Sequence, residues 1–372
     1  MSRDTTPALG TRGQPGRWRR AVEGAAVALH RRAWGDGRES YIFKADTSYG
    51  SSTADDDQVA EAARRMRGGT EVPVEVEGPV IRPAVWTWEV PLYFWLGGIA
   101  GGSSFVALAA DLAGDRRTAV IARRVTLGAA VPCAPLLVMD LGRPERFLNM
   151  MRIFKPRSPM SMGAWCLAAF SSTAGVSVFA DLLGRRRTAG LFGGATAVFG
   201  TYLGSYTGVL LASTAVPVWA RSRMFLPPIF VCTAAATGAA ANRLVLAATG
   251  TEVGHPSRTA LGTIETAAMG TELLLSSLNE RRLGRLGEAL DEGRANRLFE
   301  LAKWSVRVGL GLRFARGRGG PWTHHVASVL YLLGGLSFRF AWIEAGRNSA
   351  RDDDAVARMS RVRGGGVRQE QA

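Results

Sequence analysis

Long apolar segments follow one another between Trp86 and Trp342, each about the length that an α-helix needs to cross a hydrocarbon core of roughly 30 Å. We place eight spans at residues 90–111, 119–140, 162–183, 189–212, 224–248, 259–278, 297–314 and 324–343. Gly and Ala fill their interiors, as close helix packing in lipid favours, and Trp219 and Trp342 stand near span ends like interfacial anchors. The pattern predicts an all-α polytopic membrane protein with eight transmembrane helices.

Polar segments flank the spans. Residues 1–85 are rich in Arg, Asp and Gly and lack a hydrophobic period, which predicts a long, largely disordered N-terminal arm, and residues 344–372 read as a disordered C-terminal tail. Between them we expect two four-helix bundles, at 86–213 and 214–343.

A weak internal repeat accompanies this division. PLYFWLGGIAGGSS, starting at Pro91, aligns with PPIFVCTAAATGAA, starting at Pro227, and the alignment matches Phe94 with Phe230 and Gly102 with Gly238. Helices made of small residues also look alike by composition alone, so the sequence leaves both explanations open.

Charge and composition narrow the classes of function. The chain has 46 Lys and Arg against 31 Asp and Glu, a net charge of +15, but the arginines form short clusters between apolar segments, as at residues 185–187. That placement is typical of loops beside membrane lipid and excludes nucleic acid as a partner. The three cysteines stand alone and the four histidines cannot form a pair on facing spans. We therefore expect no haem, no metal and no iron–sulfur cluster in this chain.

Polar side chains gather at the membrane face where the first span begins. They come from the start of the first span, the loop after the second span and the end of the fourth span. An apolar pocket with a few hydrogen-bonding groups is what a quinone headgroup needs. From the residues alone, the candidate set is Glu89, Tyr93, Asp140, Arg143, Tyr202, Ser205 and Tyr206.

Four motifs, in order, resemble the NrfD/PsrC-type family, the polysulfide reductase membrane subunit and quinone-interacting anchor of molybdopterin oxidoreductases. They are WTWEVPLYFWLGGIAGG from Trp86, DLGRPERF from Asp140, KPRSPMSMGAW from Lys155 and SYTGVLLASTAVPVW from Ser205. The resemblance covers roughly residues 86–250.

The resemblance implies an eight-span anchor in the cell membrane that binds menaquinone or ubiquinone and has no catalytic residue of its own. It implies a four-cluster iron–sulfur partner subunit, wired to a molybdopterin catalytic subunit that carries molybdenum or tungsten. The implied quinone site falls on Tyr93, Asp140, Leu141, Gly142 and Tyr206. Some family members carry a His where this chain has Tyr93, which leaves the proton-handling group open.

Four ionisable residues fall inside spans, where burial is costly without a partner. Arg243 and Glu265 are at similar depth, as are Glu272 and Arg307, which predicts two ion pairs or a proton path. Two other functions compete with the quinone anchor: a secondary transporter with a four-plus-four helix repeat and a mid-membrane site, and a purely structural anchor.

Overall fold

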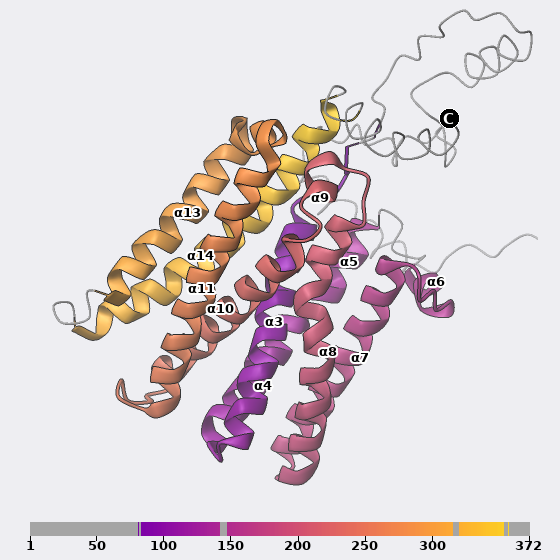
Figure 1. Cartoon of the computed structure of the whole chain (residues 1–372). Coiled ribbons are helices and arrows are strands. Elements are labelled where there is room, and N and C mark those ends of the chain that lie inside the picture. The colour runs from indigo at the N-terminus through magenta and orange to yellow at the C-terminus, as the bar shows by residue number, and fades with distance from the viewer. Residues whose placement is uncertain (1–80, 82, 142–146, 315–319, 353–355, 357–372) are drawn as a thin grey trace, which may run out of the picture. The chain divides into compact units, whose positions relative to one another are not determined.

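The computed structural model describes residue 81 and residues 83–141, 147–314, 320–352 and 356, and every regular element in these ranges is a helix (Figure 1). The N-terminal arm up to residue 80 and the tail beyond residue 356 lie outside the described residues. The long helices are α3 (Glu89–Leu112), α4 (Arg116–Ala130) continued by α5 (Cys133–Asp140), α7 (Pro159–Leu182), α8 (Arg186–Ala212), α10 (Leu226–Ala248), α11 (Pro256–Leu283), α13 (Gly293–Phe314) and α14 (Gly320–Arg351). The short elements are α6 (Phe147–Arg152), α9 (Pro217–Arg221), η2 (Gly284–Gly287) and α12 (Glu288–Asp291).

The all-α prediction is confirmed for the described ranges. One long helix lies over each predicted span except the second, which α4 and α5 cover together. Five segments are long and apolar enough to cross a membrane: Glu89–Leu112, Arg116–Asp140, Pro159–Leu182, Leu226–Ala248 and Trp322–Arg351. That α8, α11 and α13 also cross it stays a prediction.

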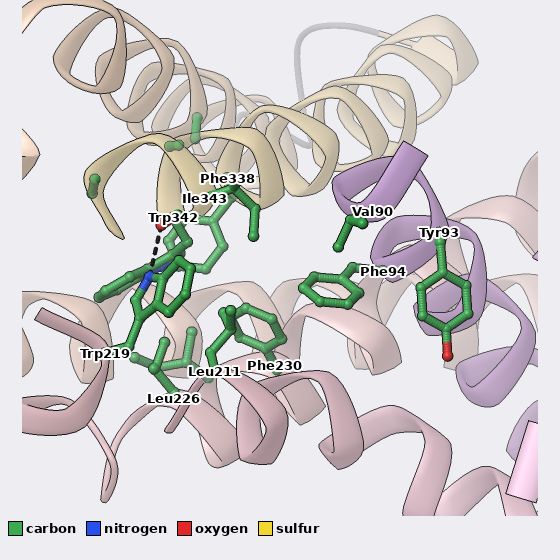
Figure 2. Packing of buried hydrophobic residues seen from close by; sticks show 14 of the residues in the cluster. Val90, Tyr93, Phe94, Leu211, Trp219, Leu226, Phe230, Phe338, Trp342 and Ile343 are labelled. Atoms are coloured by element: carbon green, nitrogen blue, oxygen red, sulfur yellow. Dashed lines mark hydrogen bonds between the residues drawn. The ribbon is translucent and has the colours of Figure 1, made fainter. Parts of the chain in front are cut away.

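The end of the last helix differs from the prediction. Helix α14 continues to Arg351, past residue 343, because its extension is buried: Ala345 and Ala350 are fully covered and the Trp219 ring lies against Gly346. Trp219 and Trp342 are not interfacial anchors, since both are buried and the Trp219 indole N–H donates to the Trp342 carbonyl at 2.8 Å (Figure 2).

The long helices form two sets with the same internal packing. In the first set, α3 packs on α4, α4 on α7, α7 on α8 and α8 on α3. In the second set, α10 packs on α11, α11 on α13, α13 on α14 and α14 on α10. The sets meet mainly where α3 and α8 lie against α10 (Figure 1).

The α3–α10 contact joins residues that the repeat alignment pairs. The Phe94 and Phe230 rings lie 6.5 Å apart, and a Cβ added to Gly238 would lie 2.7 Å from the Gly102 Cα. Equivalent residues meet in this way when two helices are related by an approximate two-fold axis.

Both helices also end on the same turn. A glycine with positive φ follows each, Gly114 at 74° and Gly250 at 77°, and the N–H of the next residue donates to a carbonyl of the last helical turn at 2.9 Å. Helix α7 ends on the same turn at Gly184, so it is the contact between equivalent residues of α3 and α10 that favours a true repeat.

Candidate functional site

A cavity of about 280 Å³ lies in the first helix set, at the end where α3 begins and α5 ends; we call this the cavity end. Four of the sequence-predicted residues, Tyr93, Asp140, Leu141 and Tyr206, line it together. They come from α3, α5 and α8 and from the residue after α5, so the fold brings these four distant positions to one space.

Two local features of the sequence shape the cavity. Pro132 separates α4 from α5, as expected of a residue that cannot continue helical hydrogen bonding, and α5 then carries Asp140 to the cavity wall. Gly163 of α7 makes room for Tyr206, because a Cβ at Gly163 would lie 2.1 Å from the Tyr206 ring. The glycine of the third motif therefore leaves the space that the Tyr206 ring occupies.

Two buried tyrosines stand in the cavity wall. Tyr93 is 2 % exposed and Tyr206 is 4 % exposed, and both line the cavity. Figure 2 shows the Tyr93 hydroxyl pointing away from Phe94 and the apolar cluster that joins the two sets. A tyrosine hydroxyl can donate and accept a hydrogen bond, so both residues are suited to bind a ligand in the cavity that they line.

Apolar side chains close the same cavity at the cavity end. Phe147, Met150 and Met151 come from the short helix α6, and Met160 comes from the first turn of α7. The aromatic and methionine content of the loop after the second span was the available signal, although none of these four residues was among the predicted site residues.

Other predicted site residues lie elsewhere. Glu89 is buried beside the cavity and accepts a hydrogen bond from Thr87, but it does not line the space.

The two remaining predicted residues of α8 do not line this cavity either. Tyr202 stacks on the Tyr206 ring with centroids 5.7 Å apart. Ser205 donates to the Tyr202 carbonyl at 3.0 Å and lines a different cavity, of about 530 Å³, between α3, α8, α10 and α11. Gly142 and Arg143 lie outside the described residues.

The second set holds a buried ion cluster centred on Glu265, at the end opposite the cavity end. Arg313 donates to the Glu265 carboxylate at 2.5 Å, Arg243 lies 3.8 Å from its other oxygen, and Ser328 donates at 2.9 Å. The expected contact between Arg243 and Glu265 is present, and Arg313 is a closer partner that the sequence analysis missed.

The expected pair of Glu272 and Arg307 is wrong. Arg307 is exposed on α13, with its guanidinium 5.6 Å from the Trp304 ring. Glu272 is buried and accepts a hydrogen bond from Ser276 at 2.7 Å.

A second ion cluster, also missed by the sequence analysis, lies in the first set. The Arg123 guanidinium binds the Asp111 carboxylate and, at 2.7 Å, the Asp181 carboxylate. Arg123 is on α4, between acids from α3 and α7, just as Glu265 on α11 lies between arginines from α10 and α13. The charges are inverted, but the helices correspond.

Comparison with known families agrees with the four sequence motifs. The family described as polysulphide reductase, NrfD, matches residues 80–279, which is more than half of the chain and includes the whole lining of the 280 Å³ cavity. The comparison with curated proteins found no match.

Proposed function

This chain belongs to the polysulphide reductase, NrfD, family of membrane subunits of oxidoreductase complexes, and on that premise we propose that it binds a quinone in the 280 Å³ cavity. In this proposal the chain exchanges electrons between the membrane quinone pool and an iron–sulfur partner subunit. The observation that carries the proposal is that two buried tyrosines, Tyr93 and Tyr206, line one mainly apolar cavity together with Asp140.

The cavity fits the headgroup of a quinone. Its volume is near the lower end for small-molecule sites, roughly 300 Å³, and its wall is mainly apolar with few polar groups. A quinone ring has two carbonyl oxygens that accept hydrogen bonds, and the tyrosine hydroxyls are matching donors. Asp140 adds one ionisable group to the wall.

Each lining group then has a defined task. A bound quinone would supply two-electron redox chemistry coupled to two protons. Tyr206 and Tyr93 are the residues that would hold its carbonyl oxygens, and fixed donors in a site of low dielectric favour negative charge that develops on those oxygens. Asp140 is the group that would pass protons to and from the end of the bundle. Phe147 and Met151 exclude water from the ring.

The same proposal includes the assembly. We propose that all eight long helices cross the membrane as two four-helix bundles, and that a four-cluster iron–sulfur subunit covers the cavity end and connects to a molybdopterin subunit holding molybdenum or tungsten. Leu148, Ile153 and Phe154 are 55–69 % exposed beside the cavity. An apolar surface of this kind is typical of a protein interface.

A transporter with a four-plus-four repeat is the second candidate, favoured by the α3–α10 repeat and by the 530 Å³ cavity between the sets. Transporter sites of that kind are formed by interrupted helices at mid-membrane. Helices α3 and α10 run unbroken past this cavity, from Glu89 to Leu112 and from Leu226 to Ala248. We therefore favour the quinone subunit.

Photolabelling tests the proposal directly. The complex in its native membrane is illuminated with an azido-quinone, and the modified peptides are identified by mass spectrometry. We expect label on α6, α7 or α8 at residues of the 280 Å³ cavity, with excess menaquinone or ubiquinone competing according to the quinone used. Label confined to residues such as Val231 and Ile264 of the larger cavity, or label without competition, would contradict the proposal.

A further inference from the structure

Helix α11 carries two buried glutamates on one face, and their surroundings differ. Glu265 is fully buried and has two arginine partners within 4.0 Å. Glu272 is 5 % exposed, and no cation of the described ranges lies within 4.0 Å of its carboxylate. Its hydrogen bond comes from the Ser276 hydroxyl, one helical turn further along. A buried carboxylate without an ion pair is costly, so the neutral acid is the alternative state open to it.

A line of polar groups leads from Glu272 toward the cavity end. Ser276 and Glu280 follow at four-residue spacing, hence on the same helical face, and Glu280 pairs with Lys303 of α13 at 3.1 Å. The Glu280 and Lys303 side chains are 35 % and 22 % exposed, so the outer end of the line reaches the molecular surface.

A small cavity follows the same line. Its volume is about 20 Å³, and Glu272, Ser276, Glu280 and Lys303 all belong to its wall. A space of roughly 10–15 Å³ holds one water molecule when polar partners are present. The cavity therefore has room for a water between the carboxyl group and the exposed pair.

Arg339 of α14 faces Glu272 from the interior of the molecule. It is 1 % exposed, its guanidinium lies 3.6 Å from the centre of the Phe230 ring, and it donates to the Phe230 carbonyl at 3.3 Å. Among the described residues its Nε and Nη1 atoms have no hydrogen-bond partner. This cation acts on Glu272 through its field and not through contact, so it stabilises the carboxylate less than an ion pair would.

We propose that Glu272 is a proton-exchanging carboxyl group, reached by water along Ser276, Glu280 and Lys303 from the cavity end. A hydronium ion entering beside the exposed pair gives its proton to the Glu272 carboxylate and leaves as water, and release is the reverse. The charge facing Arg339 thus changes by one with each uptake. The proposal does not rest on quinone binding, because none of these residues lines the 280 Å³ cavity.

Titratable and charged groups face Glu272 from each packed helix. They are Glu280 on α11, Cys232 on α10, Lys303 on α13 and Arg339 on α14. The test therefore has to report on the Glu272 carboxyl itself.

Dicyclohexylcarbodiimide provides such a test, since this apolar reagent modifies protonated carboxyl groups in membrane interiors. The full chain in native membranes is treated with it and analysed by peptide mass spectrometry. We expect modification of Glu272 that weakens as the pH is raised, with Glu265 unmodified in the same molecules. Glu265 is the matched control because it is buried on the same helix but ion-paired. Equal modification of both residues, or none at Glu272 when both react after unfolding, would overturn the proposal.

Infrared spectroscopy measures exchange itself. The acid-minus-neutral difference spectrum of the full chain should contain a protonated-carboxyl C=O band that shifts in D₂O. The band should be absent in Glu272→Gln, which can still accept the Ser276 hydrogen bond, and present in Glu265→Gln. A band that survives in Glu272→Gln or does not shift in D₂O contradicts the assignment.

Discussion

The two helix sets bury the same kind of ion cluster with opposite signs. In the first set one arginine, Arg123, lies between two aspartates, and in the second set one glutamate, Glu265, lies between two arginines. The central residue is on the second long helix of each set and its partners are on the first and third. The correspondence indicates that the packing fixes where charge can be buried, while the sign is free provided that opposite charges meet.

The sets differ at the cavity end. The first set has a 280 Å³ cavity there that Tyr93 and Tyr206 line, whereas the second set has a cavity of about 20 Å³ beside Glu272. Polar groups that meet one another stabilise the fold, and polar groups that face a space are available for chemistry. Changes in the clusters should therefore affect stability, and changes in the cavity should affect activity.

The largest effect is expected from separating the sets. A Cβ on Gly238 would lie 2.6 Å from the Gly102 backbone, so Gly238→Leu forces α3 and α10 apart. Overpacking of side chains typically costs about 1–3 kcal/mol. A clash between two backbones should exceed this range and the cost of any one ion cluster, because neither backbone can rotate away as a side chain can. We expect almost no folded chain by size-exclusion fluorescence. Gly128→Leu, where a Cβ meets nothing within 4 Å, is the control, and equal losses in both variants would argue against the contact.

The next effect is expected at Glu265. Glu265→Ala leaves Arg313 and Arg243 buried without their anion, and the loss of one partner of a buried pair costs about 3–5 kcal/mol. Thermal melting in detergent measures the change. The double variant with Arg313→Leu should recover part of the loss, and strictly additive losses would show that the two residues do not interact.

A smaller loss is expected at Arg123. Its partner Asp111 is 27 % exposed and its partner Asp181 is 6 % exposed. Arg123→Ala therefore leaves one acid that water can stabilise and one that is buried, whereas Glu265→Ala leaves two buried arginines. We expect a cost of roughly 1.5–3 kcal/mol, as for hydrogen bonds to charged groups. The same melting assay compares it with Glu265→Ala, and a larger loss at Arg123 would contradict the role given to burial.

The smallest effect is expected at Asp115, which caps α4 and links it to α11. Partial burial raises the pKa of Asp115, but hydrogen bonds from Ser257 and Thr118 outweigh burial and hold that pKa below its usual value. Its contribution to stability is thus present above the unfolded value of about 3.9 and is lost as the pH falls through the folded value. Asp115→Ala should cost about 1 kcal/mol at pH 7 and less in acid. A cost independent of pH would show that the carboxylate charge is not involved.

Much of this arrangement could be predicted from sequence, and the failures have a common cause. Span length, motif order and the Phe94–Phe230 alignment depend on residue type and spacing, which the sequence displays directly. Arg307 and Arg313 are six residues apart on α13, so they lie on different faces of that helix. Which of them is the buried cation depends on how α13 is rotated about its axis, and the sequence does not display that rotation. The prediction that Trp219 is an interfacial anchor was wrong because the position of another helix decides its burial. Helix α14 extends over the Trp219 ring and covers it.

The cavity was predicted only in part. The sequence identified Tyr93, Asp140 and Tyr206 because polar groups are conspicuous in apolar segments. Polarity and spacing alone did not separate Tyr206 from Tyr202, one turn away on the same helix, and only the family resemblance favoured Tyr206. The physical reason is the space that Gly163 leaves on α7 for the Tyr206 ring.

The central claim, that the Tyr206 hydroxyl holds a quinone carbonyl, is tested most directly by Tyr206→Phe in the assembled complex. The variant keeps the ring and removes only the hydroxyl. Quinone-linked turnover should fall about tenfold or more, because a hydrogen bond to developing charge is worth roughly 1.5–3 kcal/mol. Dye-linked activity and subunit assembly should be unchanged, and Tyr331→Phe, which removes a buried hydroxyl from the second set, should behave as the native protein. Unchanged quinone-linked turnover in Tyr206→Phe would contradict the account.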